Sequence, residues 1–314
     1  MSSSHHKTLV SLVMNTGSGH HAAGHQDLPT QLAQFFRAQG FEVDVYLPSA
    51  SNELSHMVKM AVGRHQRQHR PGIVVAAGGD GTLNTVAQKL VYTDIALGII
   101  PLGTFNYVAR ALNIPLEPMA AAQVIADGVR REVNVSTVND YVYLNNASIG
   151  LYPKIIEQRE TDNARFGRFR LVALLSGFAV LMREQYKLRL KMTIDGEKKQ
   201  MESPLVFFGN NQLQLQDFHL QLSACVEQGK LAAVAITELG RWQLIKLVHR
   251  LQLGTFEQAP EVTAICAESI KIESRARIMK VAIDGEIVYI NPPLLFKVAH
   301  KALQVMVQHD PASV

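Results

Sequence analysis

Hydrophobic and polar residues follow two alternating rhythms along the first 130 residues of this chain. Short apolar or alternating runs are typical of strands, and they predict strands at 8–14, 41–47, 73–77 and 95–100. Between them, apolar residues recur every three or four positions, which predicts helices at 28–39, at 53–64, at one stretch that ends near 91, at one that ends at 112, and at 118–128. This β-α-β-α order predicts a largely parallel sheet flanked by helices.

The rhythm changes at about residue 131, where apolar and polar residues begin to alternate strictly. The alternation predicts strands at 133–138, 141–144 and 188–192 and around positions 206, 231, 270 and 281. Helical insertions are predicted near 152–184 and 241–253, and the tail at 294–307 again has the spacing of strands. We therefore expect a second, antiparallel β domain after the first α/β domain.

Composition and charge narrow the class of protein. A chain of 314 residues with 47% hydrophobic and 18% charged residues is typical of about two folded globular domains. The net charge of +4 suits contact with anionic lipid head groups or nucleotides, but it is too small to indicate nucleic-acid binding. The longest apolar run, 171–182, falls short of the ~20 residues of a membrane span, so we expect a buried helix or a helix on a membrane surface.

Two cysteines offer no disulfide framework, and the chain starts without a secretory signal. We therefore predict a cytoplasmic protein. The alternative is a protein that binds peripherally to the inner face of the membrane. Cys225 and Cys266 both lie in apolar strand patterns, and we expect them to be inert core residues.

The stretch 78–84 carries the clearest chemical signal. Three glycines in four positions follow an all-apolar strand and precede a helix, so that backbone N–H groups can crowd around an anion. Thr82 is expected to cap the helix, whose positive end then faces the same place. A turn of this kind is built for phosphate. Asp80 would repel phosphate unless it acts through a metal ion or takes a proton, which favours phosphoryl transfer.

Three motifs in this order resemble the diacylglycerol kinase-like catalytic domain, in particular the bacterial lipid kinases related to sphingosine and ceramide kinases. They are Gly-Gly-Asp-Gly-Thr at 78–82, Pro-Leu-Gly-Thr-Phe-Asn at 101–106 and Ile-Asp-Gly-Glu at 283–286, with support from 144–150 and 15–19. The resemblance implies an α/β nucleotide-binding domain of residues 1–132 and 293–314. It also implies a lipid-substrate β-sandwich of residues 133–292, with the ATP site between the two domains.

The resemblance also implies site residues, and ATP and Mg²⁺ as cofactors. Nucleotide-binding roles fall on Asn15, Thr16, Ser18, Gly19, Gly78, Gly79, Asp80, Gly81, Thr82, Asn84, Thr104 and Asn106. Glu286 matches the general base and Asp284 its acidic neighbour, while Asp80 would act through the catalytic Mg²⁺ of ATP or as an alternative base. The expected reaction is transfer of the γ-phosphate to the hydroxyl of a diacylglycerol-like, sphingoid or ceramide lipid.

The chain departs from the family pattern at two positions. Tyr107 follows Asn106 where the family usually has an acid, and Gln228 stands where many bacterial members have an acidic ligand of a structural Mg²⁺. A second Asp-Gly-Glu, at 195–197, is followed by two lysines, and we interpret it as a plain turn.

Two other functions stay open at this point. An NAD kinase shares the Gly-Gly-Asp-Gly-Thr turn but not the loop at 101–106, and a non-catalytic nucleotide- or lipid-binding module would explain Tyr107 and Gln228. The histidines at 20, 21 and 25 leave a metal site open as a further alternative, although no Cys or acidic residue has the spacing of a partner ligand. Basic and aromatic residues at 165–170 fit either membrane docking or a domain interface, and a homodimer is a further open alternative.

Overall fold

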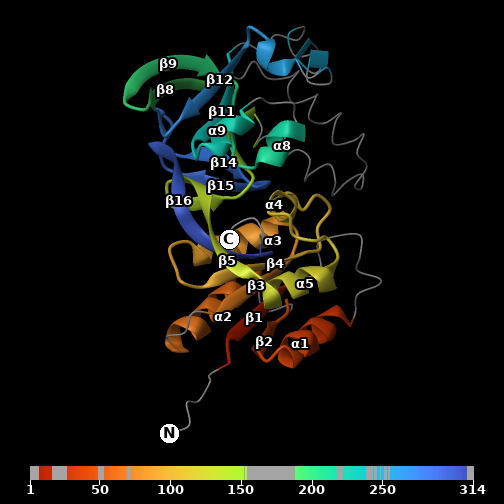
Figure 1. Cartoon of the computed structure of the whole chain (residues 1–314). Helices are drawn as coiled ribbons and strands as arrows, with labels where there is room; N and C mark the ends of the chain where they lie inside the picture. The colour runs from red at the N-terminus through yellow and green to blue at the C-terminus, as the bar shows by residue number, and fades with distance from the viewer. Residues whose placement is uncertain are drawn as a thin grey trace, which may run out of the picture. The chain divides into compact units, whose positions relative to one another are not determined.

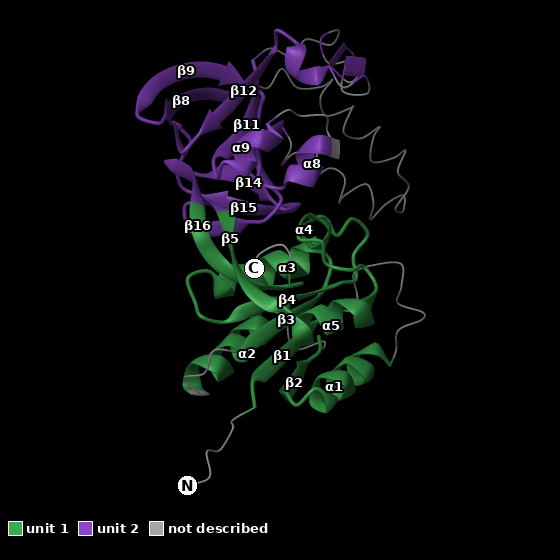
Figure 2. Ribbon diagram, viewed as in Figure 1, with its two compact units in different colours: residues 1–135, 299–314 green, residues 136–298 purple. Residues whose placement is uncertain are grey.

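The structure, a computed structural model, describes residues 7–15, 27–48, 53–68, 72–151, 153, 188–217, 222–237, 243, 246–247, 249–250, 253 and 255–309 (Figure 1). The chain divides into two units, which are coloured in Figure 2. Unit 1 comprises residues 1–135 and 299–314, and unit 2 comprises residues 136–298.

Four parallel strands form the centre of unit 1. They are β1 (Leu9–Met14), β2 (Glu42–Tyr46), β3 (Ile73–Gly78) and β4 (Ala96–Pro101), in the order β2-β1-β3-β4. Every residue of β1, β3 and β4 is buried, because helices cover both faces of a parallel sheet. The last part of β16 (Leu294–Val307) extends this sheet next to β4, where Val305 pairs with Leu97.

Helices cover the sheet of unit 1 in two pairs (Figure 1). One face carries α1 (Leu28–Ala38) and α5 (Pro118–Asp127), and the other carries α2 (Leu54–Gln68) and α3 (Asp80–Leu90). The short helix α4 (Tyr107–Ala111) follows β4. The start of α5 is fixed by the side chain of Glu117, which accepts hydrogen bonds from the N–H groups of Met119 and Ala120.

Helix α2 continues four residues beyond the predicted end at 64. His65 explains the difference, because this residue is only 1% exposed and its Nε2 lies 3.1 Å from the buried Oγ of Ser11 in β1. The basic run at 64–70 is typical of a solvated helix end. Packing of the His65 ring against the sheet nevertheless extends α2 to Gln68.

Unit 2 is built from a six-stranded antiparallel sheet and from the antiparallel part of the ten-stranded sheet that also contains the parallel strands of unit 1. The first has the order β12-β11-β10-β7-β14-β15, with β7 (Asn146–Gly150), β10 (Leu205–Gly209), β11 (Leu231–Ile236), β12 (Val262–Ala267), β14 (Met279–Ile283) and β15 (Glu286–Ile290). In the second, the start of β16 pairs with β13 (Ser269–Glu273), followed by β8 (Leu188–Ile194) and β9 (Glu197–Ser203). Strand β5 (Val129–Val138) enters unit 2 from unit 1 and pairs with β6 (Tyr141–Tyr143).

The two sheets of unit 2 face each other across one apolar core. Phe208 of β10 stacks on Phe296 of β16, with ring centroids 3.7 Å apart. Strand β8 shows the alternation behind this core, since Leu190 and Met192 are buried in it while Arg189 and Lys191 face outward. The predicted fold class, a parallel α/β domain followed by an antiparallel β-sandwich domain, is confirmed.

The remaining described elements of unit 2 are α8 (Gln212–Asp217), α9 (Ser223–Glu227) and the 3₁₀ helix η1 (Phe256–Gln258). The prediction that both cysteines are core residues of strands is confirmed only in part, since Cys225 is buried but lies on a helix, and Cys266 lies in a strand but is exposed. Cys225 lies on α9 and is joined to Cys266 of β12 by a disulfide, with the Cα atoms 5.8 Å apart. The two residues are 41 positions apart in sequence, so only the packing of α9 beside the sheet brings them together.

Candidate active site

Three loops of unit 1 meet at the carboxyl edge of its sheet. Strands β1, β3 and β4 are parallel neighbours, so the loops that follow them emerge at the same edge. The N–H of Asn15 donates to the carbonyl of Ala77 at 2.9 Å, and the N–H of Leu102 donates to that of Gly78 at 2.9 Å. We call the loops that follow β1, β3 and β4 the first, second and third loops, and these contacts make the three adjoin one another.

The second and third loops touch through two glycines. A Cβ atom on Gly103 would lie 2.6 Å from the Cα of Gly79, a distance that real Cβ atoms essentially never show. Only glycine at position 103 therefore permits this approach of the two backbones. The contact brings the loop at 101–106 against the start of α3.

Helix α3 begins at Asp80 with Gly79 as its N-cap, and no side chain caps it. The prediction that Thr82 caps this helix is wrong, because Thr82 lies inside the first turn and is buried. Its Oγ1 accepts a hydrogen bond from the Asn15 side chain at 3.4 Å. The first N–H groups of a helix have no partner within it, so the start of α3 keeps donors for an anion.

Asp80 joins the start of α3 to the start of α4. One carboxylate oxygen accepts from the N–H of Tyr107 at 3.3 Å, and the other accepts from the N–H of Val108 at 3.2 Å. The acid that the resemblance links to Mg²⁺ or to proton transfer therefore also caps a helix. No local pattern in the chain predicts this contact, because Asp80 and Val108 are 28 residues apart.

Asn106 shapes the third loop from within. Its φ of 51° lies in the left-handed region, and its side chain accepts from the N–H and donates to the carbonyl of Gly103, each at 2.9 Å. Thr104, by contrast, is exposed. Within this loop the amide of Asn106 thus holds the backbone, while Thr104 is an exposed residue.

Tyr107 occupies the position where the family usually has an acid. Its ring stacks on Phe105 with centroids 5.7 Å apart and an interplanar angle of 8°, and the Arg110 guanidinium lies 5.7 Å from the Tyr107 ring centroid. Phe105 is 57% exposed. An aromatic and cationic stack therefore stands where the resemblance leads us to expect an acid.

The hairpin of the third motif lies in unit 2 and joins β14 to β15. Asp284 and Gly285 have φ values of 46° and 91°, and Ile283 pairs with Glu286 across the turn. Positive φ at both central positions is the geometry that an Asp-Gly pair favours in a two-residue hairpin. Glu286, the first residue of β15, is exposed.

The carboxylate of Asp284 is held by the backbone of residues 144–146. It accepts from the N–H groups of Leu144 at 2.8 Å and of Asn145 and Asn146 at 2.9 Å each. Within the described ranges, the carboxylate of Glu286 has no hydrogen bond or ion pair. The two acids of this motif thus differ sharply in their surroundings.

A buried tyrosine lies next to this acid in unit 2. Burial, assisted by the negative charge of Asp284, raises the pKa of Tyr143 well above its ordinary value of 10.0. Tyr143 therefore stays neutral at any physiological pH. This phenol therefore adds no charge near the hairpin.

Several sequence-predicted residues lie outside the described residues. These are Thr16, Ser18 and Gly19 of the first loop, the histidines at 20, 21 and 25, and the stretches at 165–170 and 171–182. Among the residues that the structure does describe, no group of three or more His, Cys, Asp or Glu side chains could hold a metal ion. No helix in those ranges is long and apolar enough to cross a membrane.

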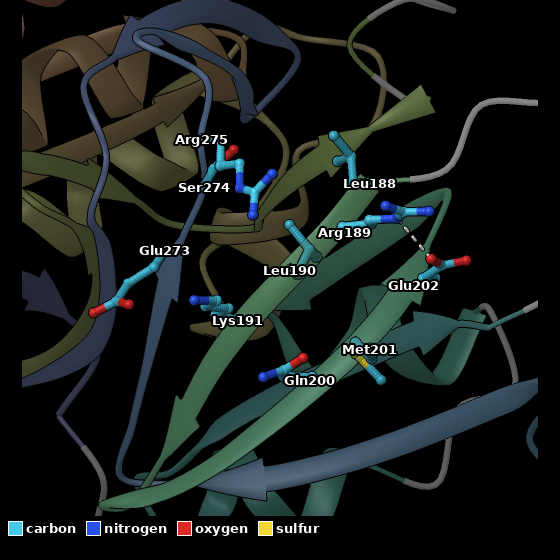
Figure 3. Close-up of a pocket in the computed structure, with 10 residues that line it drawn as sticks. All are labelled: Leu188, Arg189, Leu190, Lys191, Gln200, Met201, Glu202, Glu273, Ser274 and Arg275. Carbon is cyan, nitrogen blue, oxygen red and sulfur yellow. Dashed lines mark hydrogen bonds and ion pairs between the residues drawn. The ribbon is translucent and has the colours of Figure 1, made fainter.

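Two surface pockets in the described parts lie away from the motif residues. A groove of about 710 Å³ opens in unit 2 where β13 leaves β8, with Arg189, Arg275 and Leu188 around it (Figure 3). Another, of about 770 Å³, lies in unit 1 beside Arg130 and Lys301.

Comparisons with known proteins agree with this arrangement. Residues 10–138 match the diacylglycerol kinase catalytic domain, and residues 157–307 match the YegS C-terminal NAD kinase beta sandwich-like domain. The chain belongs to the bacterial diacylglycerol kinase-like family.

Named relatives are distant. A diacylglycerol kinase of Staphylococcus haemolyticus is 27% identical over 267 residues, which cover 82% of this chain and 76% of the relative. One of Bacillus subtilis is 36% identical over 123 residues, 38% of this chain and 39% of the relative. The crystal structure of a diacylglycerol kinase from Bacillus anthracis shares the fold, with a TM-score of 0.63 at 19% identity over 98% of each chain.

Proposed function

We propose that this protein is a lipid kinase that transfers the γ-phosphate of ATP to a hydroxyl group of a lipid, either diacylglycerol-like or of the sphingoid and ceramide class. The observation that carries the proposal is the meeting of three loops at the carboxyl edge of the unit 1 sheet. There, glycine backbones and the start of α3 offer N–H donors to phosphate.

In this proposal, unit 1 binds the nucleotide. The N–H groups of the first turn of α3 hold phosphate oxygens, and the helix dipole adds attraction for the negative charge. The exposed hydroxyl of Thr104 and the side chain of Asn15 add polar contacts at the rim. Gly78, Gly79, Gly81 and Asn84 complete the set proposed for the phosphates.

Mg²⁺ enters this proposal as part of the substrate MgATP, where it offsets charge on the phosphates. Both carboxylate oxygens of Asp80 already accept N–H groups, so we propose that Asp80 acts on MgATP from a fixed position. The residues around Gln228 do not suit a structural metal, since the Glu227 carboxylate is hydrogen-bonded by the Gln212 amide and Gln228 brings no charge. We assign no resident metal there.

Unit 2 supplies the base. The acceptor hydroxyl oxygen attacks the γ-phosphorus, the bond from that phosphorus to the bridging oxygen of ADP breaks, and the hydroxyl proton passes to the Glu286 carboxylate. An exposed carboxylate with no hydrogen bond or ion pair in the described ranges is free to take that proton. The acceptor lies in a bilayer, so we also propose peripheral contact with a membrane surface.

The test is transfer of radiolabelled phosphate from ATP into a total lipid extract, with NAD as a second acceptor. We expect labelled lipid from the wild type and a loss of about 10²–10⁴-fold in Glu286→Gln with ATP binding retained. Glu197→Gln removes the acid of the other Asp-Gly-Glu turn and should keep wild-type turnover. Label in NAD alone would support an NAD kinase, and label in neither acceptor would support a binding module.

A further inference from the structure

Asp284 is tied to the turn at 144–146 by four hydrogen bonds. Its Oδ2 accepts from Leu144, its Oδ1 accepts from both Asn145 and Asn146, and its own N–H donates to the carbonyl of Asn146 at 2.9 Å. Three N–H donors on one carboxylate use most of its acceptor capacity. Little of that capacity is left for a substrate proton.

The turn that holds Asp284 is itself fixed by buried side-chain amides. The Oδ1 of Asn145 accepts from the side chain of Asn211 at 3.1 Å, and the side chain of Asn146 donates to the Oε1 of Gln214 at 2.9 Å. All four amide side chains are buried. Buried amides in a connected network hold one geometry, because each broken contact would leave an unsatisfied polar group.

The hairpin transmits this anchor to Glu286. Only Gly285 separates Asp284 from Glu286, and the pairing of Ile283 with Glu286 fixes the register of the turn. The backbone position of Glu286 therefore depends on where Asp284 is held. The Glu286 side chain extends from that fixed backbone into solvent.

We infer that Asp284 is a positioning residue, whose carboxylate fastens the hairpin carrying Glu286 to the turn at 144–146 and exchanges no proton in the reaction. The inference rests on the proposed function, in which Glu286 is the base. It assigns the two acids of the motif separate tasks, one that moves a proton and one that fixes where this happens.

A second Asp-Gly hairpin in this chain is anchored in the same way, through an Asp carboxylate that accepts backbone N–H groups. Asp195 and Gly196 form a hairpin with φ values of 48° and 89°, and the Asp195 carboxylate accepts from the N–H groups of Glu268 at 3.2 Å and Ser269 at 2.9 Å. This hairpin joins β8 to β9 and carries Glu197. The same local chemistry thus occurs at a hairpin without a proposed catalytic role, which provides a control.

The experiment compares Asp284→Asn with Asp195→Asn by amide hydrogen exchange and by phosphate transfer from ATP to diacylglycerol vesicles as a function of pH. Asparagine tolerates the positive φ of both sites. Its side-chain NH2 group replaces one carboxylate oxygen, so part of the set of backbone N–H groups would face a donor instead of an acceptor. In Asp284→Asn we expect the amides of 144–146 to lose protection and kcat to fall by about 10²-fold, as for a displaced catalytic group. The KM for ATP should not change. The acid limb of the plot of kcat against pH, which reports protonation of the proposed base Glu286, should keep its apparent pKa.

Asp195→Asn should lose protection at Glu268 and Ser269 only and keep the wild-type kcat. An Asp284→Asn variant that keeps protection at 144–146, or whose acid limb disappears, would overturn the inference. If Asp284→Asn does not fold, Asp284→Gly takes its place, since glycine accepts the same backbone conformation. If the wild type transfers no phosphate to lipid, the proposed function fails, while the exchange data still support or overturn the anchor.

Discussion

The carboxylate of Asp80 accepts a hydrogen bond from the backbone N–H of Val108 at 3.2 Å, which links the first turn of α3 to the first turn of α4. The same carboxylate also accepts from Tyr107. The phosphate loop and the third loop are thereby joined by one side chain as well as by the contact of Gly79 with Gly103. Changes at either contact should therefore alter the proposed nucleotide site.

Replacing Asp80 with alanine should destabilise unit 1 and weaken ATP binding. The substitution leaves two N–H groups of α4 without their acceptor, which costs about 1–3 kcal/mol. Urea unfolding and calorimetric titration with ATP measure the two effects. Asp195→Ala removes a similar acceptor in unit 2 and should lower stability without changing ATP affinity. Unchanged stability in Asp80→Ala would contradict the capping role.

Replacing Gly103 with alanine should separate the second and third loops. The new Cβ would meet the Cα of Gly79 at 2.6 Å, so the backbones must move, at a cost of about 1–3 kcal/mol. ATP affinity should fall with stability. Gly63→Ala, in the interior of α2 with its nearest neighbour 3.5 Å away, should instead stabilise by about 0.5–1 kcal/mol. Equal unfolding curves for Gly103→Ala and the wild type would argue against the tight contact.

Stability should fall as the pH drops from about 6.5 to about 4. Burial lowers the pKa of His65 to about 4 against an ordinary value of 6.5; the charge of Asp44 opposes this shift, and those of Arg64 and Arg130 add to it. The unfolded chain therefore binds a proton in this window while the folded chain does not, so acid favours unfolding.

The matching measurement is urea unfolding between pH 7.5 and pH 4 for the wild type and His65→Gln. The His65 contribution, about 1–2 kcal/mol once solvent screening is allowed for, should vanish from the variant. The control is His300→Gln, which replaces an exposed histidine of β16 and should keep the wild-type slope. The same pH slope in wild type and His65→Gln would refute the assignment.

Replacing Gln214 with leucine should destabilise unit 2. Gln214 accepts a hydrogen bond from the buried side chain of Asn146, and its loss leaves that donor unsatisfied at a cost of about 1–3 kcal/mol. Thermal unfolding followed by circular dichroism is a suitable measurement. Gln200→Leu, on an exposed position of β9, should stay within about 0.5 kcal/mol of the wild type. If Gln214→Leu melted at the same temperature as Gln200→Leu and the wild type, the result would count against the buried network.

Much of the architecture could be predicted from local pattern. The all-apolar run of β3 and the alternation in β8 each report directly how many faces of the strand are covered. The predictions of helix ends and of the element that carries Cys225 were wrong where tertiary packing outweighed local sequence preference. Helix α2 continues beyond its predicted end at 64 because His65 packs against Ser11. Cys225 contacts Cys266 because α9 lies beside the sheet.

The sequence by itself determined the fold class, the order of the elements and the motifs of the candidate site, because hydrophobic period and turn chemistry are local properties. Only the tertiary structure decided what the acids of those motifs touch. The N–H partners of Asp80 lie 27 and 28 residues away along the chain, and those of Asp284 lie 138 to 140 residues away. A carboxylate takes its role from the donors and charges around it, and folding alone brings such distant groups within hydrogen-bonding distance.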